Sequence, residues 1–236
     1  MIKKLVRRVA VVLCVLSCFS SGVLAEEYNH DAAMTNARLG MAFLDKGLYT
    51  ASKEHLLTAI KEDPKLAVGW YSMAYYLEKT GNINAADQYY QKAVSVEPHS
   101  GSAINNYGTF LCRTGKYQAA IDTFLRAANE PNYLQSASAY ENAGICALKI
   151  PNNTLALKYF HEALDNNPSM PFSLLSLARL YHQTGNEASA EKYFTLFQNL
   201  ALYQKPASVV EQYRQYAFSG SVVTHQELPM PKTQLH

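Results

Sequence analysis

The sequence contains little of the chemistry that catalysis, metal binding or nucleic-acid binding requires. Its 236 residues carry a formal net charge of only +2, so there is no basic excess to neutralise phosphates. It has four cysteines and seven histidines, but no Cys-x-x-Cys pair and no two histidines at metal-ligand spacing on a helix. The Gly-Lys pair at 115–116 lacks the earlier glycine of a phosphate-binding loop, and no Gly-x-Ser-x-Gly turn occurs. We therefore expect no nucleic acid, no metal ion, no cofactor and no enzymatic activity.

Long apolar runs are missing too, since no segment after the N-terminus approaches the length of a membrane span. The N-terminus itself has the three parts of a secretory signal peptide. Four basic residues within the first eight positions precede an apolar stretch at 9–19, and Val23-Leu24-Ala25 provides a cleavage site. Removal of the predicted signal peptide, 1–25, leaves 17 basic and 19 acidic residues, so the exported body is mildly acidic.

A second cleavage site lies inside the same segment. Val15-Leu16-Ser17-Cys18 approximates a bacterial lipobox, in which 1–17 would be removed and Cys18 would carry lipid. Multiple acyl chains hold a protein on a membrane. A retained short anchor is the third alternative. Either cleavage places the body outside the cytoplasm, where disulfides can form.

A period of about 34 residues runs through the rest of the chain. Small residues recur at spacings of 34, 34, 36 and 34 positions: Gly40, Ala74, Gly108, Gly144 and Ala178. Sixteen positions after each of them comes a bulky apolar residue: Leu56, Tyr90, Phe124, Phe160 and Phe194. The two extra residues in the third unit fall near Asn132 and Tyr133. Such a unit is long enough for two helices of about a dozen residues and two turns.

Helix packing explains why these residue types recur at fixed positions. A small residue lets the two helices of a unit approach closely, and we expect the bulky residue to fill the space between units. Glycines follow the first helix, where a left-handed cap is favourable: Gly47, Gly81, Gly115 and Gly185. Prolines close three of the units, and Asn84 is expected to cap the second helix of its unit.

This pattern resembles the tetratricopeptide repeat (TPR). It predicts an all-α fold over residues 30–218, a solenoid of five helix-turn-helix repeats forming a right-handed superhelix. The expected repeats are 33–66, 67–100, 101–136, 137–170 and 171–204, followed by a capping helix at 206–218 and a disordered tail at 219–236.

The first helix of each TPR repeat lines the concave face, which is therefore the candidate binding surface. The positions expected there are rich in Met and Tyr in the first two repeats: Met34, Ala37, Met41, Leu44, Val68, Tyr71 and Tyr75. Such an apolar surface suits a partner helix or strand. The alternative is that these side chains pack against neighbouring helices.

Asparagines occupy the same face of the next two repeats, at Asn105, Asn106 and Asn142. An amide side chain can bind a peptide backbone, or else another side chain within the stack. Arg113 and Lys149 lie near, but Glu141 opposes them, so we predict no carboxylate clamp.

Cys112 and Cys146 fall on the first helices of successive repeats. They would form a disulfide if their Cα atoms come within about 7 Å, and would otherwise be buried free thiols.

Two segments carry a more specific resemblance. Residues 105–112, Asn-Asn-Tyr-Gly-Thr-Phe-Leu-Cys, and residues 141–148, Glu-Asn-Ala-Gly-Ile-Cys-Ala-Leu, resemble the third and fourth repeats of the type IV pilus biogenesis proteins PilF and PilW. The insertion at Pro131-Asn132-Tyr133 fits as well. The resemblance covers about residues 30–205 and includes both cysteines.

The resemblance implies a pilotin, a lipoprotein on the periplasmic side of the outer membrane. Such a protein binds the outer-membrane secretin subunit PilQ and promotes its localisation and multimerisation, with the early repeats implicated in binding. We expect the protein by itself to be a monomer. The alternative is a generic periplasmic TPR adaptor for cell-envelope or other secretion machinery.

Overall fold

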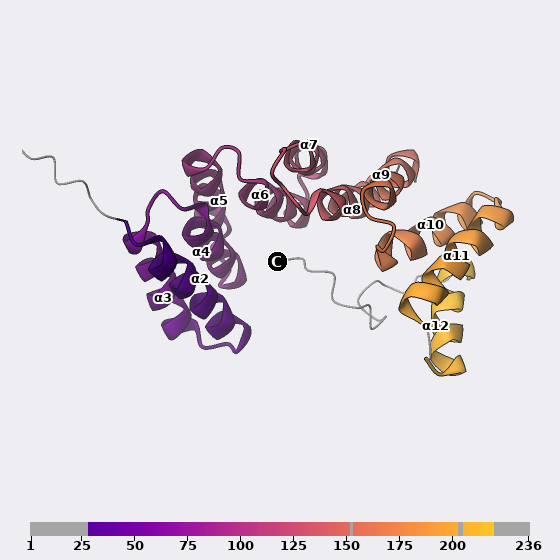
Figure 1. Ribbon diagram of the computed structural model, residues 1–236, viewed down its shortest axis with the longest axis horizontal. Helices are drawn as coiled ribbons and strands as arrows, with labels where there is room; N and C mark the ends of the chain where they lie inside the picture. Colours follow the sequence, from indigo (N-terminus) through magenta and orange to yellow (C-terminus); the bar gives the residue numbers. More distant parts are fainter. Residues whose placement is uncertain (1–27, 152, 203–204, 220–236) are drawn as a thin grey trace, which may run out of the picture.

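The computed structural model describes residues 28–151, 153–202 and 205–219, and these form eleven α-helices and no strand (Figure 1). The helices are α2 (His30–Asp45), α3 (Tyr49–Glu62), α4 (Ala67–Lys79), α5 (Ile83–Val96), α6 (Gly101–Arg113), α7 (Tyr117–Ala128), α8 (Ser136–Ala147), α9 (Asn153–Asn166), α10 (Pro171–Gln183), α11 (Glu187–Ala201) and α12 (Ala207–Phe218). The predicted all-α repeat fold is confirmed. The signal peptide, Cys18 and residues 220–236 of the predicted tail lie outside the described residues.

The helices pack as five pairs that follow one another along an arch (Figure 1). The first helices of successive pairs, α2, α4, α6, α8 and α10, also contact each other in turn. The short α12 packs on α10 and α11, where Tyr213, Tyr216 and Ala217 are buried against the last pair. The last pair thus has its apolar end covered, as a solenoid requires.

The recurring small residues make room for the bulky residue of the same helix pair. A Cβ atom added to Gly108 would lie 2.8 Å from ring carbons of Phe124, which is closer than packed carbon atoms approach. Phe160 fills the same space against Gly144, and Leu56 against Gly40. The bulky residue therefore fills space within its own helix pair. It also fills space between units, as expected, because the Phe160 ring lies 5.9 Å from that of Phe172 in the next repeat and the Tyr90 ring 4.9 Å from that of Phe110.

The turns follow the glycine pattern but not the predicted asparagine cap. All four predicted glycines have φ between 71° and 84°, in the left-handed region. The cap of α5 is Asn82, whose side chain accepts a hydrogen bond from the Ala85 backbone, and not Asn84. Asn82 directly follows Gly81, so the cap comes immediately after the turn glycine and α5 begins at Ile83.

Candidate functional site: a concave groove on the first three repeats

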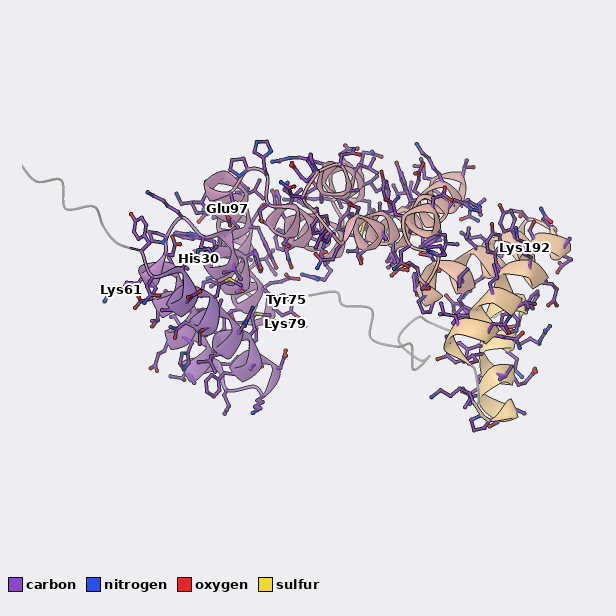
Figure 2. All side chains as sticks on the ribbon, in the orientation of Figure 1. His30, Lys61, Tyr75, Lys79, Glu97 and Lys192 are labelled. Atoms are coloured by element: carbon purple, nitrogen blue, oxygen red, sulfur yellow. A yellow bond between two sulfur atoms is a disulfide. The ribbon has the colours of Figure 1, made fainter. Side chains whose placement is uncertain are left out.

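A groove of about 530 Å³ lies on the inner side of the arch. Its walls are α2, α4 and α6, with the loop before α8 and the first turn of α8 at one end. Figure 2 shows Tyr75 and Lys79 of α4 on this inner side, and the Lys79 ammonium lies 5.2 Å from the centre of the Tyr75 ring. The volume falls within the usual range for ligand pockets.

Most of the predicted binding residues lie together in this groove. Eight of the ten line it: Met34, Ala37, Met41, Val68, Tyr71, Tyr75, Asn105 and Asn106. Leu44 does not, because it is only 6% exposed and belongs to the core. Asn142 is also outside the lining and is 7% exposed.

The helical period explains the position of Leu44. Residues seven apart lie on nearly the same face of a helix. Met34 and Met41 form one such pair and share the groove face, where both are half-buried. Ala37 and Leu44 form another pair, rotated towards the core, and are 1% and 6% exposed. Of this second row, Ala37 still lines the groove, whereas Leu44 does not.

An ion pair joins two walls of the groove. Arg113 at the end of α6 donates two hydrogen bonds to the Glu78 carboxylate of α4, at 2.6 and 2.7 Å. The same carboxylate accepts from the Tyr90 hydroxyl at 3.3 Å, and the guanidinium lies 5.6 Å from the centre of the Tyr75 ring. Burial disfavours the guanidinium charge, but the hydrogen bonds that Arg113 donates to Glu78 and the negative charge of that carboxylate outweigh it and raise the pKa of Arg113. This pair fixes α4 against α6.

Tyr71, which lines the groove, remains uncharged. Burial, together with the negative charge of Glu97, raises the pKa of Tyr71 to about 12, although Arg38 opposes the shift. The Tyr71 hydroxyl is thus a neutral polar group at physiological pH.

The insertion between the third and fourth repeats closes one end of the groove. Tyr133 and Gln135 both line it, and neither was among the predicted binding residues. The Tyr133 ring packs where a Cβ atom of Gly101 would otherwise lie, so this glycine is needed for the contact. Leu134, between the two lining residues, is 97% exposed. The departure from the 34-residue spacing was the one sequence signal that pointed to this segment.

The asparagines form a network that connects the groove to α8. The side-chain nitrogen of Asn142 donates to Oδ1 of Asn105 over 3.1 Å. Asn142 therefore makes the bond within the stack that the sequence left open, and Asn105 alone of the two reaches the groove.

The comparisons with known proteins agree with this architecture. A family model described as "Tetratricopeptide repeat" matches residues 43–201. The chain belongs to the tetratricopeptide repeat family. It is 26% identical to the Pseudomonas aeruginosa type IV pilus assembly protein PilF over 78% of this chain and 73% of that protein. It is also 32% identical to an uncharacterised Haemophilus influenzae protein over 52% of this chain and 69% of that one.

Solved structures share the fold. The Pseudomonas aeruginosa PilF structure has a TM-score of 0.66 at 24% identity, covering 81% of this chain and 94% of the other. That of PilW, a widely conserved type IV pilus biogenesis factor, has a TM-score of 0.62 at 24% identity, covering 83% and 96%. The chain is a PilF/PilW-like TPR protein, and the predicted resemblance is confirmed.

A disulfide ties two adjacent helices of this TPR stack next to the groove. Cys112 of α6 and Cys146 of α8 are bonded, with Sγ–Sγ 2.22 Å and Cα atoms 5.8 Å apart. Cys146 is fully buried. The bridge lies on the same two helices as Asn105 and Asn142, so it holds the helices that carry the asparagine network.

Within the described part of the chain, the structure contains neither a metal-binding cluster nor a membrane-spanning helix. No group of three or more His, Cys, Asp or Glu side chains is arranged to hold a metal ion there. None of the described helices is both long enough and apolar enough to cross a membrane.

Glu141 faces away from the groove, towards the next repeat. Its carboxylate is 3% exposed and accepts hydrogen bonds from the Ser173 backbone nitrogen at 3.0 Å and hydroxyl at 2.7 Å. Ser173 lies in the first turn of α10, so this carboxylate satisfies a free N–H at the helix start. Burial raises the pKa of Glu141, and the two bonds from Ser173 only partly oppose the shift.

This raised pKa predicts a pH-dependent stability. The folded protein holds the Glu141 proton more tightly than the unfolded chain, in which the pKa of this side chain has its ordinary value of 4.5. The stabilisation that comes from this tighter proton binding is complete below pH 4.5, and it is lost as the pH rises through the pKa of Glu141 in the folded protein. We expect Glu141→Gln to become more stable relative to wild type as pH rises from 4.5 to 8, measured by urea unfolding. The exposed Glu211→Gln is the control, and parallel pH profiles of wild type and Glu141→Gln would contradict the assignment.

Proposed function

We propose that this TPR protein acts in type IV pilus biogenesis as a pilotin that binds the outer-membrane secretin subunit PilQ and promotes its localisation and multimerisation. The observation that carries the proposal is the groove on the first three repeats, with Met34, Met41, Tyr71 and Tyr75 along its walls. Similarity to PilF and PilW supports the pilus role. An apolar groove bordered by polar groups is the usual form of a peptide-binding surface.

In this mechanism the protein binds its partner and catalyses no reaction. The ion pair between α4 and α6 and the disulfide between α6 and α8 keep the groove walls in place before any partner arrives. A preformed groove lowers the ordering cost of binding. We propose that the protein works on the periplasmic side of the outer membrane, after export by its signal peptide. Lipid on Cys18 would raise its concentration there, and mass spectrometry of the mature N-terminus distinguishes this form from cleavage after Ala25.

The test introduces charge on the groove face without touching the core. In a Met34→Glu/Met41→Glu variant, we expect unchanged helical circular dichroism, because both side chains are partly exposed. Heat-resistant secretin multimers should fall at least about tenfold, since two charged carboxylates would replace the apolar methionine surface that the partner buries. The variant avoids Leu44, because a carboxylate at that buried position would lie unpaired in the core of the first repeat.

Leu57→Glu is the matched control, because Leu57 is 44% exposed on α3 and does not line the groove. Wild-type multimer levels in the groove variant would contradict the groove assignment. A deletion strain that keeps normal pili and normal multimers would favour the generic adaptor instead.

A further inference from the structure

We infer that a second cavity, between the second helices of the last two repeats, is a docking site that takes a tryptophan side chain of a partner protein against the Pro168 carbonyl. The inference goes beyond the proposed function, because this cavity shares no residue with the groove on the first three repeats. Figure 2 shows Lys192, which lines the cavity, at the opposite end of the arch from Tyr75.

The cavity has a volume of about 470 Å³ and lies between α9 and α11. Leucines from three helices line it: Leu164, Leu174, Leu196 and Leu200. Leu196 and Leu200 are one turn apart on α11 and are 44% and 42% exposed. Apolar side chains that stay exposed around a cavity are typical of a binding surface.

The same place in the earlier repeats is occupied by the protein's own side chains. Between the first two repeats it holds Trp70, whose ring lies 5.6 Å from that of Tyr89 and whose Nε1 donates to the Pro64 carbonyl at 2.8 Å. Between the second and third repeats, Arg126 donates to the Pro98 carbonyl at 2.6 Å. In both places a large side chain with an N–H donor binds the carbonyl of the proline that ends the repeat.

The last two repeats keep the proline but lack the large side chain. Pro168 is the equivalent proline, eight positions after the bulky residue of its repeat. The tryptophan position is occupied by Leu174 and the arginine position by Leu196. Neither leucine has a side-chain donor, and among the described residues no N–H donates to the Pro168 carbonyl. The cavity is therefore the space that these two leucines leave open.

The aromatic surroundings of the cavity match those of Trp70. Tyr193 lines the cavity and stands at the repeat position of Tyr89, the ring that Trp70 contacts. The Lys192 ammonium lies 5.3 Å from the centre of the Tyr193 ring, and that of Lys92 lies 5.6 Å from the centre of the Trp70 ring. An indole in the cavity would thus meet a tyrosine ring and a cation, as Trp70 does.

The charge at one end of the cavity matches the N–H edge of an indole. Asp165, which is exposed and lines the cavity, lies in the last turn of α9, and Pro168 follows that helix. The carboxylate, the proline carbonyl and the helix C-terminus all make this end negative. The positive edge of an aromatic ring is favoured there and an acidic side chain is disfavoured. The leucines around it favour an apolar ring over a guanidinium group.

A tripeptide probe tests the site directly. Acetyl-Gly-Trp-Gly-amide is titrated into the protein, and the methyl signals of Leu174, Leu196 and Leu200 are followed by NMR. We expect saturable shifts at these leucines, with a Kd at least about threefold lower than that of acetyl-Gly-Leu-Gly-amide. The same peptide with 1-methyltryptophan lacks the N–H donor and should bind about threefold or more weakly than the tryptophan peptide.

Leu196→Arg is the matched variant, because it places an arginine at the repeat position from which Arg126 binds its proline carbonyl. Leu196 is largely exposed, so the fold should be kept, and the Kd for the tryptophan peptide should rise about fivefold or more. Leu39→Arg is the control, since Leu39 is 41% exposed on α2 and lines neither cavity.

Three results would overturn the inference: no saturable shift at the three leucines, equal affinity for the tryptophan and leucine peptides, or unchanged affinity in Leu196→Arg. Equal affinity for the 1-methyltryptophan peptide would contradict the hydrogen bond to Pro168. None of these results bears on the proposed function, which is tested separately by the secretin multimers.

Discussion

Removal of the Cys112–Cys146 disulfide is expected to lower the free energy of unfolding by roughly 3–4 kcal/mol. The bridge joins residues 34 apart in the chain, one full repeat. Closing a loop of this length restricts the unfolded chain, and the entropy model assigns that restriction most of the effect. The gain in stability is especially useful in a repeat stack, because each repeat contacts only its neighbours and the bridge links two of them covalently.

The measurement compares wild type and Cys112→Ala/Cys146→Ala in urea, each with and without a reducing agent. Alanine is preferred to serine because Cys146 is fully buried, where a hydroxyl would need a partner. Wild type should lose stability on reduction, whereas the double variant should not respond to the reducing agent. Equal unfolding midpoints for oxidised wild type and the double variant would contradict the predicted contribution.

The repeat architecture could be predicted from the sequence because its determinants are local and recur. Gly108 and Phe124 occupy the same repeat positions as Gly144 and Phe160. In each pair the aromatic ring fills a space that is open only because the facing residue is glycine, so the two residues recur together. The turn glycines are equally local, since a positive φ depends on the residue itself. Repetition made each of these weak signals strong.

The groove was predicted less completely, because its details depend on rotation and on contacts between repeats. Leu44 was misplaced because a three- and four-residue spacing does not distinguish two adjacent rows of a helix. Tyr133 lies in an insertion that has no repeat position to compare it with. Its role depends on the absent side chain of Gly101.

The buried polar partners could not be read from the sequence at all. Asn105 and Asn142 were both named as peptide-binding candidates, yet one binds the other and only Asn105 reaches the groove. Glu141 was considered only as a charge opposing a clamp. In the structure it binds Ser173, 32 residues along the chain. Hydrogen bonds between repeats depend on the distance between helices, which composition and spacing do not fix.

Arg113→Met is expected to destabilise the protein by about 2–3 kcal/mol. Removing one partner of a fully buried ion pair costs about 3–5 kcal/mol. The smaller figure applies here because the Arg113 side chain is 37% exposed, although that of Glu78 is only 12% exposed. Methionine keeps much of the apolar stem beside Tyr75, so the loss falls mainly on the unpaired carboxylate.

A double-mutant cycle separates the pair from its surroundings. Glu78→Gln/Arg113→Met should be more stable than Arg113→Met alone, because no charge is left unpaired beside Tyr90. Lys116→Met is the matched control: its pair with Asp87 is more exposed, at 52% and 24%, and should contribute less than about 1 kcal/mol. Additive effects of the Glu78 and Arg113 substitutions would contradict the coupling. Glu78 and Arg113 lie in the last turns of the helices that carry Tyr75 and Asn105. Arg113→Met should therefore also weaken the proposed binding of secretin, whereas Lys116→Met should not.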